Sequence, residues 1–415
     1  MMVAITKSLA IFGLCQVLHA RNVPSRTWER KEQAAALPTA TLAADFKKNN
    51  VSAQWADGHP KQWGSEDIKY EYPLPPDAYW FAGTVSEDGK FVALSNGTHV
   101  KTIRTDTNVV VSEVGVPLSE IEQSVLLSRP NKTYDLIVAR GDSSLIIHIS
   151  SEGKIFGESR SIPGTLSPFG SKYTSQDGRL VLTILSAAQT VYAHDLDNPS
   201  WNLTLTGHRD SIMSAAYSPD SKYISTTSWD QTVRLYNATN GEFVRSFGPT
   251  GGQNWFTNFS PDGKYLLVAT GNEKTMFWEV ANPDAAPVVL PGYSWSRIAE
   301  WSPDSELVAG GSSGRIVVYS LKEKKTIQVW QDEDPWNSQI RVLNWFGESN
   351  SKKLAYRAQG GLEIYDFETN LKYRWGPGDF DHWSGSGSST FILKDKGWIG
   401  GEEADLTMRF WKLPF

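Results

Sequence analysis

One serine and seven histidines are the residues of this sequence that come closest to known catalytic patterns. Gly310-Gly311-Ser312-Ser313-Gly314 matches the Gly-X-Ser-X-Gly pattern of serine hydrolases. That pattern needs a sharp turn from a strand into a helix within an α/β sheet. Here it lies between two short strand-like segments, so it predicts a glycine-rich hairpin and no nucleophile.

The histidines are not arranged as metal ligands. They stand at positions 19, 59, 99, 148, 194, 208 and 382, and no two have the spacing of a metal-binding pair. Cys15 is the only cysteine, which leaves neither a disulfide nor a cysteine-ligated metal. The sequence also lacks a phosphate-binding loop and a His-Glu-X-X-His motif. We therefore expect no catalytic residues, no metal and no cofactor.

The 17 tryptophans suggest binding chemistry instead. Several precede strand-like segments and have polar neighbours. Aromatic and arginine side chains anchor interfaces, so this set predicts a binding face for a protein, peptide or glycan. The alternative is that the tryptophans are core residues wedged between sheets. The candidates are Trp80, Trp255, Trp295, Arg297, Trp336, Arg341, His382 and Trp383, with Asn254, Asn337 and Asp381 beside them.

A repeated phrase shows which elements position these residues. Tyr217-Ser218-Pro219-Asp220 returns as Phe259-Ser260-Pro261-Asp262 and as Trp301-Ser302-Pro303-Asp304. Weaker copies put the Asp or Asn of this turn at positions 88, 131, 177, 220, 262, 304, 350 and 395, which are 42 to 46 residues apart. Each unit reads as four short strands joined by polar turns, the length of one blade of a β-propeller.

The repeats predict an all-β fold, a β-propeller of four-stranded blades. A single blade cannot bury both of its faces, so blades stack around an axis. Eight markers favour eight blades, with seven as the alternative. The last unit ends after a third strand, at residues 406–413, and would leave an open edge. We predict that the alternating segment Ile68-Lys69-Tyr70-Glu71-Tyr72 supplies the fourth strand and closes the ring.

Residues 66–415 resemble the WD40 repeat family, most strongly over 207–322. The unit from Gly207-His208 through Asp220 to Asp230 and Tyr236 carries the resemblance. In that family a histidine, a Ser or Thr, an aspartate and a tryptophan form a hydrogen-bonded brace. The resemblance implies such a brace here from His208 and Asp230, with Tyr236 in the tryptophan position. The chain is identified as a divergent member of this family by its repeat spacing.

The resemblance implies a non-catalytic binding or scaffold protein whose strand starts open onto one face around a central channel. A net charge of −6 gives no basic surface for nucleic acid. One alternative is an enzyme, a hydrolase or lyase, that uses the channel mouth. Its candidate residues are Asp381, His382, Arg297 and Arg341.

The N-terminus predicts a secreted protein. Residues 1–20 have a lysine, a short apolar stretch and a small final residue, as in a signal peptide. Residues 21–65 read as a leader or surface-wrapping extension, with a dibasic pair at Arg30-Lys31. No later apolar run is long enough to span a membrane. Residence in the lumen of the secretory pathway is one alternative. An ordinary intracellular scaffold in the cytoplasm is another.

Glycosylation motifs point the same way. An Asn-X-Ser/Thr sequence marks a surface asparagine of a secreted chain. The six candidates are Asn50, Asn96, Asn131, Asn202, Asn237 and Asn258.

Overall fold

The computed structural model describes most of the chain beyond residue 44. The described residues are 45–71, 82–116, 121, 123–167, 172–272, 274–291, 296–332, 340, 342–347, 351–358, 361–377, 389–403 and 407–415. They form strands, turns and two single-turn 3₁₀ helices, η1 (Ser186–Ala188) and η2 (Lys394–Lys396). Within these ranges, neither helix approaches the length or apolarity needed to cross a bilayer.

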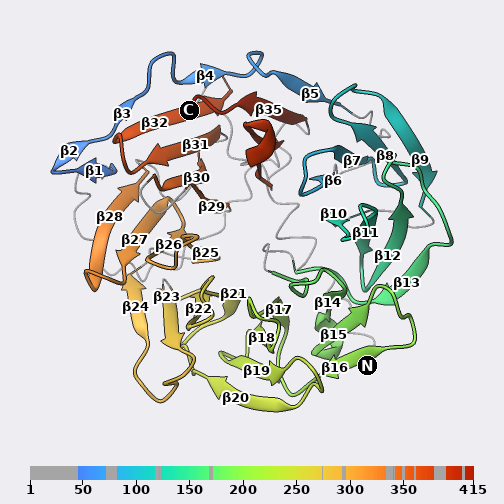
Figure 1. Cartoon of the computed structure of the whole chain (residues 1–415). Coiled ribbons are helices and arrows are strands. Elements are labelled where there is room, and N and C mark those ends of the chain that lie inside the picture. Colours follow the sequence, from blue (N-terminus) through green and yellow to red (C-terminus); the bar gives the residue numbers. More distant parts are fainter. Residues whose placement is uncertain are drawn as a thin grey trace, which may run out of the picture.

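Eight sheets surround a common axis, which confirms the β-propeller with eight blades (Figure 1). We number the blades 1 to 8 along the chain from β6. The strands of blades 1 to 4 are β6 (Ala82–Val85), β7 (Phe91–Ser95), β8 (His99–Arg104), β9 (Val110–Gly115), β10 (Gln123–Ser128), β11 (Tyr134–Arg140), β12 (Ser143–Ile149), β13 (Arg160–Pro163), β14 (Leu180–Leu185), β15 (Thr190–Asp195), β16 (Asn202–Leu205), β17 (Ile212–Tyr217), β18 (Tyr223–Ser228), β19 (Val233–Asn237) and β20 (Phe243–Phe247).

Blades 5 to 8 continue the same antiparallel pattern. Their strands are β21 (Asn254–Phe259), β22 (Tyr265–Thr270), β23 (Lys274–Glu279), β24 (Val288–Pro291), β25 (Ile298–Trp301), β26 (Leu307–Ser312), β27 (Arg315–Ser320), β28 (Lys325–Gln331), β29 (Leu343–Phe346), β30 (Lys353–Ala358), β31 (Gly361–Asp366), β32 (Leu371–Gly376), β33 (Phe391–Leu393), β34 (Trp398–Glu402) and β35 (Met408–Lys412).

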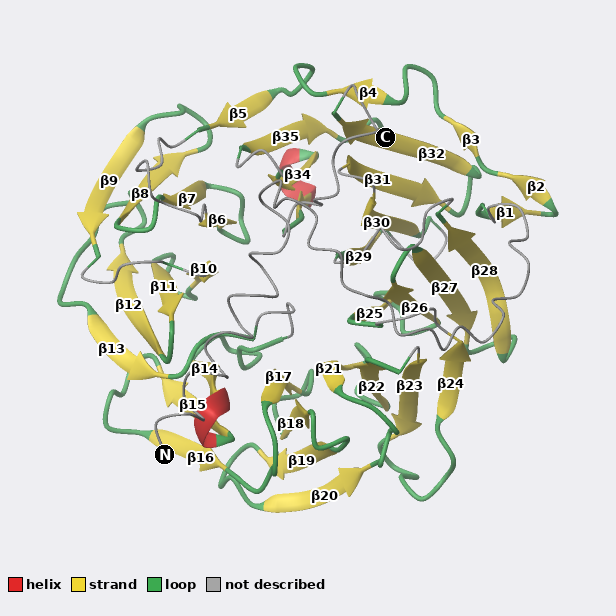
Figure 2. Cartoon of the chain, turned by 180° about the vertical axis from the view of Figure 1, so that it is seen from behind, coloured by secondary structure: helices red, strands yellow, loops and turns green. Residues whose placement is uncertain are grey.

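Burial falls from the axis to the rim of each blade. The first strand of a blade lies nearest the axis and the fourth lies at the rim (Figure 2). All six residues of β17 and of β21 are buried, whereas four of the five residues of β20 are at least partly exposed. Sheets covered on both faces need apolar residues throughout, and this explains why the inner strands lack an alternating pattern.

The ring closes as the sequence predicts. The short strand β5 (Ile68–Tyr70) pairs antiparallel with β35, with Met408 opposite Tyr70 and Phe410 opposite Ile68. Blade 8 therefore combines three C-terminal strands with one N-terminal strand. This pairing provides hydrogen-bond partners for the backbone groups along the edge of β35, which would otherwise be exposed.

Blade 3 departs from the four-stranded prediction. Its sheet contains β14, β15 and β16, while the innermost position holds two isolated bridges, Thr165 with Ile184 and Thr174 with Val181. The Tyr217 N–H of blade 4 donates to the carbonyl oxygen of Lys172 at 2.8 Å. This inner segment is therefore shared between blades 3 and 4.

Residues 45–65 lie along the rim of blade 7. Two short hairpin strands, β1 (Lys47–Lys48) and β2 (Val51–Ser52), precede β3 (Gln54–Trp55) and β4 (Lys61–Gln62). Both β3 and β4 pair parallel to β32. The sequence left the choice between a leader and a surface-wrapping extension open, and the described part of the segment is bonded to the propeller surface.

Candidate functional site

The starts of the inner strands and the turns between second and third strands share one face of the ring, because neighbouring strands are antiparallel. We call this the strand-start face. Trp255 is the second residue of β21 in blade 5, Trp229 lies in the β18–β19 turn of blade 4, and Arg297 precedes β25 of blade 6. Their side chains form one cluster. The rings of Trp229 and Trp255 are 5.3 Å apart, and the Arg297 guanidinium lies 4.6 Å from the Trp255 ring centre.

Burial assigns different roles to these three residues. Trp255 is only 3% exposed, which fits the alternative that the strand-start tryptophans are core wedges. Trp229 and Arg297 are partly exposed and present the aromatic and cationic surface. Sequence reasoning found Trp255 and Arg297 but missed Trp229. The repeat alone carried no signal that this turn meets the next blade.

Asn254 belongs to the framework of this face. Its side-chain oxygen accepts a hydrogen bond from Thr250 Oγ1 at 2.6 Å, and its amide donates to the carbonyl oxygen of Thr232 at 3.2 Å. The side chain is buried, so it joins blades 4 and 5 and does not offer a binding group. The remaining candidates lie outside the described residues: Trp80, Trp295, Trp336, Asn337, Arg341, Asp381, His382 and Trp383.

His208 forms the brace that the resemblance implies. Its Nδ1 lies 2.8 Å from Asp230 Oδ2, and its Nε2 lies 2.8 Å from Thr226 Oγ1. Tyr236, in the tryptophan position, donates from its hydroxyl to the carbonyl oxygen of Thr206 at 2.7 Å instead. Burial lowers the pKa of His208, and the hydrogen bond to Asp230 offsets this only in part. The brace ties the blade entrance to the β18–β19 turn that carries Trp229.

Asp230 carries the charge of this brace. Its burial favours the neutral acid, but hydrogen bonds from the Thr232 hydroxyl, the Arg209 N–H and His208 outweigh burial and lower its pKa to about 2. A carboxylate with so many donors serves structure, because its lone pairs are occupied.

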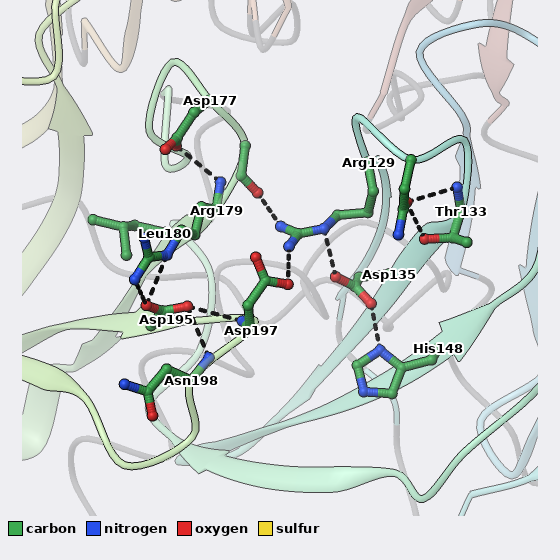
Figure 3. A network of polar contacts seen from close by, with 12 residues as sticks. Arg129, Thr133, Asp135, His148, Asp177, Arg179, Leu180, Asp195, Asp197 and Asn198 are labelled. Atoms are coloured by element: carbon green, nitrogen blue, oxygen red, sulfur yellow. Dashed lines mark hydrogen bonds and ion pairs between the residues drawn. The ribbon is translucent and has the colours of Figure 1, made fainter.

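Blades 2 and 3 are joined by an arginine network on the opposite face (Figure 3). The guanidinium of Arg129 contacts Asp135 at 3.4 Å, and also Asp197 and the carbonyl oxygen of Gly178. His148 Nδ1 lies 2.6 Å from Asp135. Asp135 and His148 belong to blade 2, while Gly178 and Asp197 belong to blade 3. Sequence reasoning did not predict these contacts, and the two that join the blades link Arg129 to residues 49 and 68 positions away.

His194 is a further buried histidine. Its Nε2 lies 2.9 Å from Thr183 Oγ1 of the neighbouring strand. Burial lowers its pKa to about 4, so the ring is neutral at physiological pH. This is a packing role, and not that of a proton-transfer group near pH 7.

The six glycosylation candidates differ in the solvent exposure of the asparagine. Asn50, Asn131 and Asn202 are exposed, and Asn96 and Asn237 are partly exposed. Asn258 is 2% exposed, and its amide faces Glu300 Oε1 at 3.4 Å. A glycan on Asn258 is incompatible with the folded blade, because β21 and β25 leave it no room.

The serine motif has no catalytic geometry. Gly310, Gly311 and Ser312 end β26, and the chain turns directly into β27. The motif is thus part of a β-hairpin, with no strand-to-helix elbow. Among the described residues, no group of three His, Cys, Asp or Glu side chains is placed to hold a metal.

The ring of antiparallel blades defines a β-propeller, and the histidine brace is similar to the one in WD40 repeats. Residues 200–237, which include His208, Asp230 and Tyr236, match the family described as WD domain, G-beta repeat. The chain therefore carries a WD40-repeat match within an eight-bladed β-propeller.

Similarity to individual WD-repeat proteins is partial. The chain is 31% identical over 126 residues to the WD repeat, SAM and U-box domain-containing protein 1 of Danio rerio, covering 29% of this chain and 25% of that protein. It is 29% identical over 152 residues to human Coronin-7, covering 34% and 16%. It is 24% identical over 190 residues to the Nuclear distribution protein nudF of Aspergillus niger, covering 41% and 42%. The matches thus span less than half of each of these relatives.

Proposed function

We propose that this propeller is a non-catalytic scaffold that binds a protein or peptide on its strand-start face. The observation that carries the proposal is the cluster of Trp229, Trp255 and Arg297, to which three consecutive blades contribute. Tryptophan and arginine residues contribute the largest share of the energy at protein interfaces. WD40 propellers generally bind proteins, which agrees with this use of the face.

A glycan is a weaker candidate for the same face. Sugar recognition by stacking needs exposed aromatic rings, and Trp255 is covered by its neighbours. Trp229 is the partly exposed ring of the cluster. A peptide side chain can pack on the single exposed ring of Trp229 and interact with the Arg297 guanidinium, and it needs no further exposed ring.

Peptide selection on the full chain tests the proposal. A displayed library of random peptides is enriched on the wild-type protein, and the selected peptides are titrated against Trp229→Ala and Arg297→Gln. We expect affinity losses of at least about tenfold for Trp229→Ala, the size typical of an interface anchor. The matched control is Arg245→Gln, on the outer strand β20. Equal losses in control and test variants, or no loss, would refute binding at this face.

We further propose that the scaffold works in the secretory pathway or outside the cell. The signal-like residues 1–20, the single cysteine within them and the solvent-accessible motifs at Asn50, Asn96, Asn131, Asn202 and Asn237 support this setting. The fold itself suits an intracellular scaffold equally well.

Expression in the native host separates these settings. The secretory proposal expects a chain without residues 1–20 whose electrophoretic mobility increases after treatment with an N-glycosidase. A chain that keeps Met1 and is unaffected by the glycosidase would establish the intracellular alternative.

A further inference from the structure

A cavity of about 580 Å³ lies on the face opposite the Trp229 cluster, where the inner strands end in their repeated turns. We call it the turn-face cavity. Four consecutive blades line it, through Glu87 of blade 1, Arg129 of blade 2, Lys172 and Asp177 of blade 3, and Tyr217 of blade 4. Its volume is within the range of pockets that hold small ligands or short peptide segments.

Arg129 is the lining cation that the fold already uses. Its side chain is 7% exposed and contacts Asp135, Asp197 and the carbonyl oxygen of Gly178 (Figure 3). A ligand would have to compete with two carboxylates for this guanidinium. Arg129 therefore holds the wall of the cavity between blades 2 and 3.

Lys172 is the lining cation that remains available. Lys172 is exposed, and its ammonium makes no hydrogen bond or ion pair with the residues that the structure describes. Its backbone carbonyl is fixed by the Tyr217 N–H, so the base of the side chain is held in place. Burial raises the pKa of Glu300 in blade 6, and the positive charge of Lys172 opposes this rise.

Two carboxylates stand on the other walls. Glu87 is exposed, and in the described part of the chain its carboxylate has no ion-pair partner. Asp177 is oriented by hydrogen bonds from Ser175 Oγ at 2.5 Å and from the Arg179 N–H at 3.0 Å. The cavity therefore presents one accessible cation and two accessible anions around the ring of Tyr217.

We propose that the turn-face cavity is a second binding site, which takes a peptide segment with an acidic residue next to a basic one. The acidic side chain would pair with Lys172, and the basic side chain with Glu87 and Asp177. A wholly acidic segment meets repulsion from the two carboxylates, and a wholly basic one meets repulsion from Lys172. Charge arrangement of this kind sets specificity more than affinity.

Titration with three labelled peptides tests this site on the full chain. Fluorescein-labelled Ala-Glu-Lys-Ala, Ala-Glu-Glu-Ala and Ala-Lys-Lys-Ala are followed by fluorescence anisotropy at low salt. We expect the mixed peptide to bind tightest. Lys172→Gln should weaken it about fivefold, the size expected for one exposed ion pair. Glu87→Gln should instead improve binding of Ala-Glu-Glu-Ala.

Controls make the outcome decisive. Lys322→Gln removes an exposed lysine from the β27–β28 turn at the rim and should leave all three affinities unchanged. Trp229→Ala should also have no effect, which separates this site from the strand-start face. Equal affinity for the three peptides, tightest binding of Ala-Lys-Lys-Ala, or equal effects of Lys172→Gln and Lys322→Gln would overturn the proposal.

Discussion

At the residue scale, a buried ion pair lies between blades 7 and 8. Arg357 of β30 and Glu403, which follows β34, are both fully buried and form a bidentate pair at 2.6 and 3.0 Å. Arg357 Nε also donates to the carbonyl oxygen of Ser389 at 2.9 Å. The pair joins blade 7 to blade 8, next to the closure of the ring.

Removing one member of this pair should destabilise the protein strongly. Arg357→Met leaves the Glu403 carboxylate buried without its guanidinium, and we expect a loss of about 3–5 kcal/mol in the free energy of unfolding. Urea denaturation measures it. The double variant Arg357→Met with Glu403→Leu should recover most of the loss, because it buries no charge. A double variant as unstable as the single one would contradict this account.

Glu300 should make the stability of the folded protein fall as the pH rises. Burial raises its pKa from 4.5 to about 7. Between these values the folded chain holds a proton that the unfolded chain has lost. The contribution of this bound proton to the free energy of unfolding is therefore complete below about pH 4.5 and is lost as the pH rises through 7.

Glu300→Gln tests this sign, since glutamine is neutral at every pH. The Tm of the variant should exceed that of the wild type at pH 8, and the difference should shrink toward pH 5. His194, whose pKa is about 4, also makes the stability depend on pH. It is present in both proteins, so its effect cancels when the two Tm values are compared at the same pH. A Tm difference that does not change with pH would show that Glu300 titrates normally.

At the element scale, Phe46 is the fully buried aromatic anchor of the N-terminal extension. Phe46 is fully buried and stacks on Tyr365, with ring centres 4.2 Å apart and an interplanar angle of 7°. Asp45 forms an ion pair with Lys372 of β32 at 2.7 Å. These contacts place β3 and β4 along the rim of blade 7, where the parallel pairs are only two residues long.

Phe46→Ala should release the extension without unfolding the ring. Short strands have few hydrogen bonds of their own, so their attachment depends on the anchor. Hydrogen exchange followed by mass spectrometry should show faster exchange in residues 45–62 and at the rim of β32. Val51→Ala, at an exposed position of the same extension, is the control. Unchanged protection in Phe46→Ala would show that backbone pairing alone holds the segment.

At the scale of the whole molecule, closure by β5 couples the two ends of the described chain. The Asp67 N–H donates to the carbonyl oxygen of Phe410 at 3.0 Å, and Asp67 Oδ2 accepts from the Lys412 N–H at 2.6 Å. Blade 8 contacts blades 7 and 1, so loss of its fourth strand exposes an edge within a closed ring.

Asp67→Pro should weaken the closure. Proline removes the N–H donor and the carboxylate together, and we expect about 2 kcal/mol from two lost hydrogen bonds. Thermal unfolding measures the loss, and Glu71→Pro, just beyond β5, serves as the control. Equal Tm values for Asp67→Pro and wild type would mean that the ring does not depend on this strand.

The sequence by itself determined the blades. Apolar strands and Ser-X-Asp turns are local features, and the turn from Ser218 to Tyr223 recurs with the same hydrogen bonds at Ser260 and Ser302. Because such turns depend on residues a few positions apart, their period revealed eight blades and the incomplete last one. The alternating pattern of residues 68–72 located the strand that closes the ring.

Only the tertiary structure decided what the side chains between blades do. Trp255 and Trp229 are equally prominent in the sequence, yet one is a buried wedge and the other is partly exposed. Arg129 and Lys172 look alike as lone cations, but among the described residues only Arg129 meets carboxylates, one from its own blade and one from the next. Such roles depend on contacts between residues one or more blades apart, and these form only when the packed ring fixes the distance between neighbouring sheets.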